Sequence, residues 1–284
     1  MRARGALAAA VALALFAGPA EAAGSSRVAA VQVAMRALGH YGSTIDGVAG
    51  PGTRRAVAAF QRRRGLMVDG IAGRQTLRAL GRRGRPGLGR RAIRVGAAGF
   101  DVAALQFRLA WRGFPSGPID GGYGARTAAA VRRFQRWAGL GADGVAGRAT
   151  IRALGGPIRR SPLSLSRPVT GPISDRFRPR GNRFHTGIDF PVPYGRTVRA
   201  ARAGTVVGAG YDPGGYGNVV HIAHGYGVTT FYAHLSRITV RRGEGVAAGE
   251  RVGTVGSTGF SSGPHLHFEV RLRGAMLNPM SGLR

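Results

Sequence analysis

Apolar positions along the chain follow two different periods. From residue 28 to about residue 155 they recur every three or four residues, the period of a helix that buries one face. From about residue 168 they alternate instead, in short runs such as NVVHIAHG and VTTFYAHL that glycine-rich turns separate. Alternation places successive side chains on opposite faces of a strand. The pattern predicts a multidomain chain with an all-α N-terminal part and a mainly antiparallel β C-terminal domain.

The helical part consists of two copies of one small unit. Residues 28–81 match residues 102–155 without a gap, and TRRAVAAFQ in the first copy corresponds to TAAAVRRFQ in the second. Each copy is predicted to form three short helices, with Pro51 in a first helical turn and with Thr53 and Thr127 as helix caps. The Asp-Gly pairs are interpreted as turns and caps rather than as metal ligands.

The first residues have the pattern of a secretory signal. Arg2 and Arg4 precede an apolar stretch over residues 6–17 and a small-residue cleavage site at residues 20–22. The apolar stretch is too short to span a bilayer, and no later stretch approaches about 20 apolar residues. We therefore expect an exported protein without a membrane span, with an uncleaved anchor as the alternative.

Segments rich in Gly, Pro, Ser and Arg lie between the periodic regions and are interpreted as linkers. The predicted organisation is a signal peptide at 1–22, a first module at 27–81, a linker at 82–100, a second module at 101–155, a linker at 156–167 and a β domain at 168–284.

Charge and cysteine content narrow the chemistry. The formal net charge is +30, and residues 23–167 hold 26 Arg against 5 acidic residues. This charge favours polyanionic partners, which for an exported protein are wall or envelope polymers rather than nucleic acid. The chain has no cysteine, so thiol catalysis and cysteine zinc sites are excluded and any metal needs His, Asp or Glu.

Six of the seven histidines lie between residues 185 and 267, inside the predicted β domain. His265 and His267 share one face of a strand, and so do His185 and Asp189, four residues apart. Two imidazoles and one carboxylate are the donor set of a catalytic zinc site with a fourth position open. His234 is a further candidate. Spacing alone leaves open whether His265 or His267 is the ligand, and it leaves iron as an alternative metal and a polar strand surface as the simpler interpretation.

The C-terminal domain resembles a known family over residues 168–281. The stretches RFHTGIDFPVPYGRTVRAARAGTVV, GGYGNVVHIAHGYGVTTFYAHLS and GERVGTVGSTGFSSGPHLHFEVR are similar to those of lysostaphin-type (LytM-like) zinc endopeptidases, which cut peptidoglycan peptides. The resemblance implies one Zn²⁺ per chain, bound by His185, Asp189 and His267. It also implies that His234 and His265 are catalytic and activate water or stabilise the oxyanion.

Two further histidines are given structural roles: His224 in the hairpin or the cleft wall, and His221 in packing or at the surface. Both helical repeats resemble a peptidoglycan-binding module, through the pattern DGxxGxxT…AVxxFQ…GLxxDGxxGxxT.

Together these features predict a secreted or periplasmic, zinc-dependent peptidoglycan endopeptidase, monomeric by default, which its tandem modules target to the wall. The arginine excess would help to retain it on anionic wall polymers. Alternatives are a non-catalytic or self-inhibited regulator of other wall hydrolases, a carboxypeptidase acting on D-alanine ends, and a nucleic-acid binder. The intact ligand positions disfavour a non-catalytic regulator. The His-Leu-His pattern disfavours a carboxypeptidase, and the predicted export disfavours a nucleic-acid binder. The sequence does not indicate which peptide bond is cut.

Overall fold

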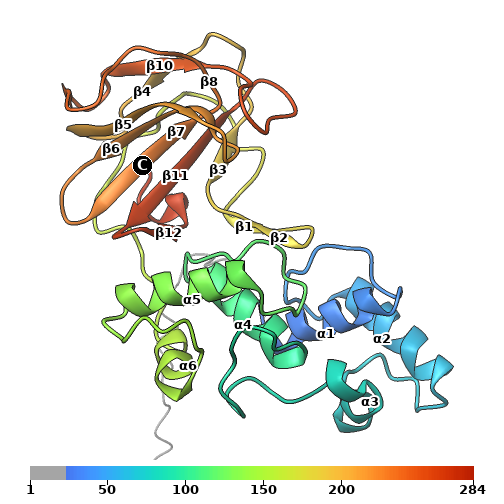
Figure 1. Ribbon diagram of the computed structural model, residues 1–284. Helices are drawn as coiled ribbons and strands as arrows, with labels where there is room; N and C mark the ends of the chain where they lie inside the picture. Colours follow the sequence, from blue (N-terminus) through green and yellow to red (C-terminus); the bar gives the residue numbers. More distant parts are fainter. Residues whose placement is uncertain (1–23) are drawn as a thin grey trace, which may run out of the picture.

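The computed structural model describes residues 24–284, and the predicted signal peptide at 1–22 lies outside this part (Figure 1). In the described part, six α-helices precede twelve strands, and all the strand pairs are antiparallel. The predicted fold class is therefore confirmed. No helix within residues 24–284 has the length and apolar character that crossing a membrane requires.

The two helical modules each contain three α-helices, as the repeat predicts. The first holds α1 (Ser26–Ala37), α2 (Pro51–Arg63) and α3 (Arg74–Ala79), and the second holds α4 (Phe100–Trp111), α5 (Ala125–Trp137) and α6 (Arg148–Leu154). The modules share a core, because Phe100, Ala103 and Phe107 of α4 pack among buried residues of the first module. Ile93, within the predicted linker at 82–100, is buried in the core of the second module.

A buried glutamine organises each Asp-Gly turn of the modules. The Gln106 side-chain amide donates to Asp120 Oδ1 (2.9 Å), the Gly122 carbonyl (3.0 Å) and Thr127 Oγ1 (3.3 Å), and its oxygen accepts from the Gly121 amide (2.8 Å). Asp120 Oδ1 also accepts from the Gly122 amide, which closes the turn. The aspartates thus have the turn role that the sequence predicts. The same set of bonds recurs around Gln32, Gln61 and Gln135.

The predicted caps Thr53 and Thr127 are wrong. The residues at the cap positions are Gly50 and Gly124, and neither makes a side-chain cap hydrogen bond. Each threonine is instead buried at the third helical position, where its hydroxyl donates back to a carbonyl of the turn and accepts from the glutamine. Pro51 does occupy the first position of α2, as predicted.

Three antiparallel sheets form the C-terminal domain. The largest has the strand order β12-β11-β7-β6-β5-β9, with β3 paired to β11, and a three-stranded sheet has the order β4-β10-β8. Side chains of both sheets form one apolar core. The predicted hairpin turn at 225–227 is confirmed by the pairing of β6 with β7. The strands are β1 (Arg178–Arg180), β2 (Arg183–His185), β3 (Ile188–Phe190), β4 (Thr197–Arg199), β5 (Gly204–Asp212), β6 (Gly217–Ala223), β7 (Val228–Ala233), β8 (Leu235–Ile238), β9 (Gly245–Val246), β10 (Arg251–Val255), β11 (Leu266–Leu272) and β12 (Ala275–Leu277).

Strand β11 separates the core from the candidate site. Its alternate residues Leu266, Phe268 and Val270 are fully buried in the apolar core. The intervening residues therefore point to the opposite face of the sheet. That face carries His267 and Glu269, which fixes where the polar chemistry of the domain lies.

The modules contact the β domain at the β1–β2 hairpin, which lies between the sheet and the helices in Figure 1. At the tip of the hairpin, the Gly181 carbonyl accepts from the Ile45 amide (2.8 Å) and the Asn182 carbonyl accepts from the Ile119 amide (2.6 Å). At its base, the Trp111 ring lies 5.1 Å from the Phe184 ring between centroids. Both modules therefore hold the segment that leads into the candidate site.

Candidate metal centre and catalytic cleft

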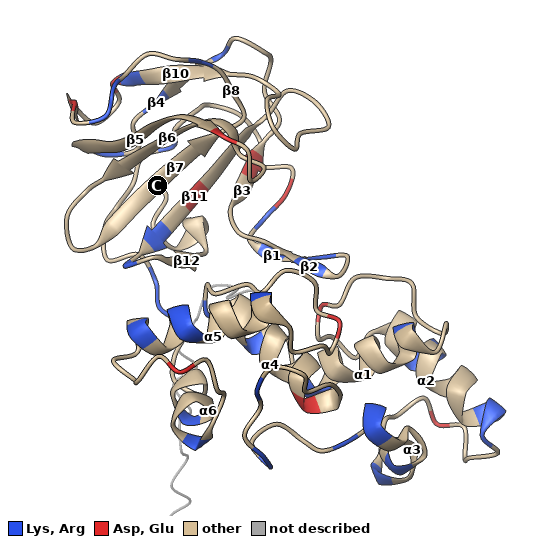
Figure 2. Cartoon of the chain, in the orientation of Figure 1, with Lys and Arg blue, Asp and Glu red and all other residues tan. Residues whose placement is uncertain are grey.

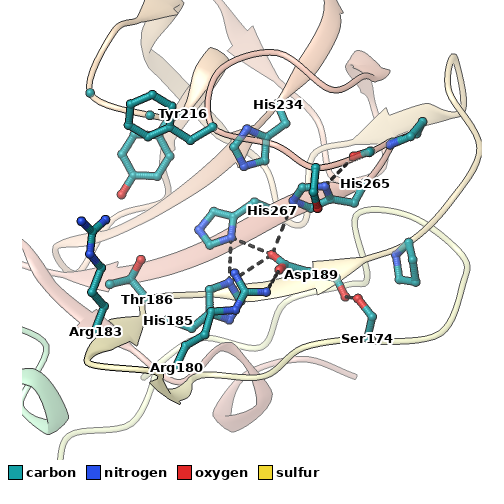
Figure 3. Close-up of a pocket in the computed structure, with 17 residues that line it drawn as sticks. Ser174, Arg180, Arg183, His185, Thr186, Asp189, Tyr216, His234, His265 and His267 are labelled. Atoms are coloured by element: carbon teal, nitrogen blue, oxygen red, sulfur yellow. Dashed lines mark hydrogen bonds and ion pairs between the residues drawn. The ribbon is translucent and has the colours of Figure 1, made fainter. Parts of the chain in front are cut away.

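The three predicted ligands meet at one point, although they come from three strands (Figure 3). His267 of β11 is paired directly with Asp189 of β3, and His185 ends β2. His185 Nε2 lies 3.1 Å from Asp189 Oδ1 and 3.1 Å from His267 Nδ1, and the third distance, from His267 Nδ1 to Asp189 Oδ1, is 2.8 Å. All three side chains are buried.

The triangle of donor atoms fits a zinc ion. Two ligands at 2.0–2.1 Å from a tetrahedral zinc lie about 3.3 Å apart, close to the distances between these atoms. The remaining ring nitrogens are already occupied, because His185 Nδ1 donates to the Arg176 carbonyl (2.8 Å) and His267 Nε2 donates to Glu269 Oε1 (3.2 Å). These bonds leave His185 Nε2 and His267 Nδ1, which face Asp189, as the ring atoms that would bind a metal ion.

Glu269 lies on the polar face of β11 next to His267 and accepts hydrogen bonds from the side chains around it. It is fully buried, and its Oε2 accepts two bonds from Arg271, from Nε (2.8 Å) and Nη2 (2.7 Å). Its Oε1 accepts from the Tyr216 hydroxyl (2.8 Å) and from Thr186, in addition to His267. The Arg271 guanidinium in turn lies over the ring of Phe231. The network fixes the tautomer and the orientation of His267.

Sequence reasoning missed Glu269, Arg271 and Tyr216. A signal for the first two was present, because residues 265, 267, 269 and 271 alternate with the apolar residues of β11 and share one face. The polar face of the strand thus continues beyond the two histidines. Tyr216 follows a glycine turn and had no such periodic signal.

Electrostatic coupling inside the cluster is strong. Burial would raise the pKa of Asp189, but hydrogen bonds from His185 and His267 outweigh it and hold the pKa far below its usual range. Burial would lower the pKa of His267, but the bonds to Asp189 and Glu269 raise the pKa to about 9. Burial of Glu269 is likewise outweighed by the bond from His267 and by Arg271, which lower its pKa to about 2. The cluster therefore stabilises a positive charge at its centre.

His234 and His265 lie side by side at the same cleft, with ring centroids 4.7 Å apart. His234 Nδ1 donates to the Thr258 carbonyl (2.8 Å), and His265 Nδ1 donates to the Gly263 carbonyl (2.9 Å). Each ring therefore carries its free lone pair on Nε2. His265 Nε2 lies 4.0 Å from Asp189 Oδ1, within reach of a molecule bound at the cluster.

The backbone of His234 is held in the left-handed region, with φ of 63°. Such a conformation is strained for a residue with a side chain and persists where neighbouring structure enforces it. Here the His234 amide donates to the Tyr216 carbonyl (2.9 Å). Burial lowers the pKa of the His234 imidazole to about 4, so the ring is neutral at pH 7.

The other histidines of the β domain lie outside the cleft. His224 bridges the Ala203 carbonyl (3.0 Å) and Thr230 Oγ1 (2.7 Å), which confirms a structural role at the hairpin. His221 stacks on Phe231, as expected of a packing residue. The cleft itself has a volume of about 580 Å³, and all its lining residues lie between 174 and 267.

Comparison with known proteins divides the chain in the same way. Residues 183–279 match "Peptidase family M23", and residues 24–80 and 99–154 each match "Putative peptidoglycan binding domain".

Curated relatives align with the C-terminal part. A 122-residue segment is 47% identical to the DD-carboxypeptidase/endopeptidase Mpg of Neisseria meningitidis and covers 42% of this chain and 28% of the relative. A 109-residue segment is 41% identical to the peptidoglycan DD-endopeptidase ShyA of Vibrio cholerae and covers 38% of this chain and 24% of the relative. The chain thus spans less than a third of either relative's length.

Among solved structures, a zinc-containing peptidase from Vibrio cholerae is 33% identical over 41% of this chain and 39% of its own, with a TM-score of 0.39. Lysostaphin of Staphylococcus simulans is 34% identical over 38% of this chain and 47% of its own, with a TM-score of 0.37. The family matches cover the site and both helical repeats. The chain therefore consists of an M23 peptidase domain preceded by two peptidoglycan-binding domains.

Proposed function

We propose that the protein is an exported, zinc-dependent endopeptidase that hydrolyses peptide bonds in the stems or cross-bridges of peptidoglycan. The observation that carries the proposal is the convergence of His185 Nε2, His267 Nδ1 and the Asp189 carboxylate on one point, beside two further imidazoles. In this proposal the three residues bind one Zn²⁺. The names of the M23 relatives, a DD-carboxypeptidase/endopeptidase and a DD-endopeptidase, support a peptide bond of peptidoglycan as the substrate.

Zinc, when bound, supplies a Lewis acid that polarises the scissile carbonyl and makes water nucleophilic at neutral pH. The residues of the chain handle the proton. The Nε2 atoms of His234 and His265 are proton acceptors, because each Nδ1–H is committed to a backbone carbonyl. One of them takes a proton from the attacking water as the carbon–oxygen bond forms. The resulting imidazolium stabilises the oxyanion and gives the proton to the amine that leaves as the carbon–nitrogen bond breaks.

The modules are proposed to target the enzyme to the wall. Arginines are spread over the helices of both modules, whereas acidic residues are few (Figure 2). A cationic surface of this kind favours association with anionic wall polymers. The cleft lining comes from the β domain, so in the described part of the chain the modules do not fill the cleft. This arrangement favours an active enzyme over a self-inhibited regulator.

Digestion of whole peptidoglycan by the purified protein tests this function. We expect about one zinc per chain and new peptide ends in mass spectra of the products, because the three residues would hold one ion that supplies the Lewis acid. Asp189→Ala and His265→Ala should abolish the new ends, the first together with zinc and the second with zinc retained. His40→Ala, a histidine substitution in the first module and outside the cleft, is the matched control. It should leave both the zinc content and the new peptide ends unchanged. Binding to the wall without cleavage by zinc-loaded protein would contradict the proposal.

A further inference from the structure

The cleft contains one arginine that lacks a partner among the described residues. Arg183, on β2, lines the cleft and is exposed, and no carboxylate lies within ion-pair distance of it in residues 24–284. Figure 3 shows its side chain at the cleft wall on the same side as Thr186. Arg180, on the same hairpin, differs because it pairs with Asp175 (2.7 Å). Arg183 is therefore free to meet an anion that enters the cleft.

The cleft offers no acidic group of its own for Arg183. Asp189 is the one carboxylate that lines the cleft within residues 24–284, and its partners are His185, His267 and, at 3.5 Å, Arg180. A cation without an opposite charge nearby keeps its attraction for a bound anion, and a guanidinium suits the planar geometry of a carboxylate.

The position of Arg183 on β2 fixes how far it lies from the proposed metal. Arg183 and His185 are two residues apart on one strand, so their side chains share a face and their Cα atoms are separated by about 6.7 Å. An extended substrate advances by about 3.3–3.6 Å per residue. A group that Arg183 contacts therefore belongs to a substrate residue one or two positions from the scissile bond.

The modules hold the hairpin that carries Arg183. Both carbonyls at its tip, of Gly181 and Asn182, accept amide hydrogen bonds from the modules, and the Gly181 amide donates to Thr44 Oγ1 (3.2 Å). A recognition group on a fixed backbone loses less conformational freedom on binding than one on a mobile loop. The contacts thus hold in place the backbone that carries Arg183.

We propose that Arg183 is a specificity-determining residue that binds a carboxylate on the substrate peptide, next to or one residue beyond the scissile bond. The inference rests on the proposed function. It adds that the enzyme distinguishes a cross-linked peptide with a free carboxylate close to the scissile bond from the same peptide with that group amidated. Amidation removes the charge and changes the size of the group little.

The test compares two purified cross-linked peptide dimers that differ in this one group, a carboxylate or a carboxamide. For the zinc-loaded full chain, we expect kcat/KM to be roughly tenfold higher on the carboxylate dimer, as a charge-assisted bond made in a cleft implies. Arg183→Gln should lose this preference through a fall on the carboxylate dimer alone. Arg183→Lys should keep part of it. Arg237→Gln, an exposed arginine outside the cleft, is the matched control and should behave as the wild type.

The outcomes separate the two proposals. If wild type cleaves both dimers and Arg183→Gln retains the same ratio, the role of Arg183 is wrong while the proposed function stands. If wild type prefers the amidated dimer, or shows no preference, the inference is likewise overturned. If zinc-loaded wild type cleaves neither dimer nor whole peptidoglycan, the proposed function fails and the inference fails with it.

Discussion

Replacing Glu269 by Gln tests the network behind the candidate metal centre. The carboxylate accepts five hydrogen bonds, two from Arg271 at Oε2 and three at Oε1, from Thr186, Tyr216 and His267. A glutamine of the same shape has one oxygen and one amide nitrogen. In either orientation its NH₂ group faces donors rather than an acceptor. The substitution also removes the charge that compensates the partly buried Arg271.

The expected cost is about 3 kcal/mol in the free energy of unfolding of the β domain, the lower end of what breaking a buried ion pair costs, because the volume and one acceptor are retained. We also expect zinc affinity to fall roughly 10- to 100-fold, since the variant no longer orients His267 for binding through Nδ1. The stability difference should shrink as the pH falls from about 4.5 toward 2. The wild-type carboxylate has a depressed pKa of about 2, so its stabilisation is present above the unfolded pKa and is lost over that interval.

Hydrogen exchange of amides in β11 during urea unfolding is the suitable assay. Tryptophan fluorescence does not isolate this domain, because Trp111 and Trp137 lie in the second module and also contact the β domain, at Phe184 and at the Leu272 carbonyl. Glu250→Gln, at an exposed position, is the matched control and should change stability by less than about 0.5 kcal/mol. A loss below about 1 kcal/mol for Glu269→Gln together with unchanged zinc affinity would refute the reasoning, since no buried ion-pair defect would then exist.

Three further predictions concern other parts of the molecule. The pKa of His267 is raised to about 9, so a proton must leave Nδ1 when metal binds. Zinc affinity should therefore rise about tenfold per pH unit from pH 7 to 9 and then level off. A flat pH profile in a competition titration would contradict this prediction. Gln106→Leu should destabilise the second module by about 3 kcal/mol, because several buried polar groups lose their hydrogen-bond partner. Urea unfolding followed by tryptophan fluorescence measures this loss. A loss below about 1 kcal/mol would contradict the role given to Gln106. Trp111→Ala should cost about 3 kcal/mol and speed hydrogen exchange over residues 178–185, and unchanged exchange there would show that the hairpin does not need the Trp111 contact.

The local period of apolar residues was sufficient to predict the order and type of the domains. The helical period and the gapless repeat predicted the six helices, and alternation predicted β11 with an apolar and a polar face. The residue types predicted a cluster of His185, Asp189 and one of two histidines, His265 or His267. The family resemblance implied His267, and the structure brings His185, Asp189 and His267 together. Spacing could not choose between His265 and His267. The strand register supports His267, because it is the residue paired with Asp189.

The remaining features depend on contacts between distant parts of the chain. The docking of the modules on the β1–β2 hairpin joins Thr44 to Gly181, 137 residues apart, and no periodicity reports such a pair. The cap prediction for Thr53 failed for a related reason, since its hydroxyl is drawn into a bond with the distant Gln32. The nitrogen that each histidine leaves free also follows from tertiary partners, such as the Arg176 carbonyl for His185.

Zinc titration of the metal-free protein, with release of new amino groups from purified peptidoglycan as the readout, tests the central claim most directly. The proposed site predicts no release without metal and a linear rise that ends at about one equivalent of zinc per chain, as expected of a single three-ligand catalytic site. Release that persists in the metal-free protein, or no release after full loading, would contradict the assignment of this cleft as a zinc endopeptidase centre.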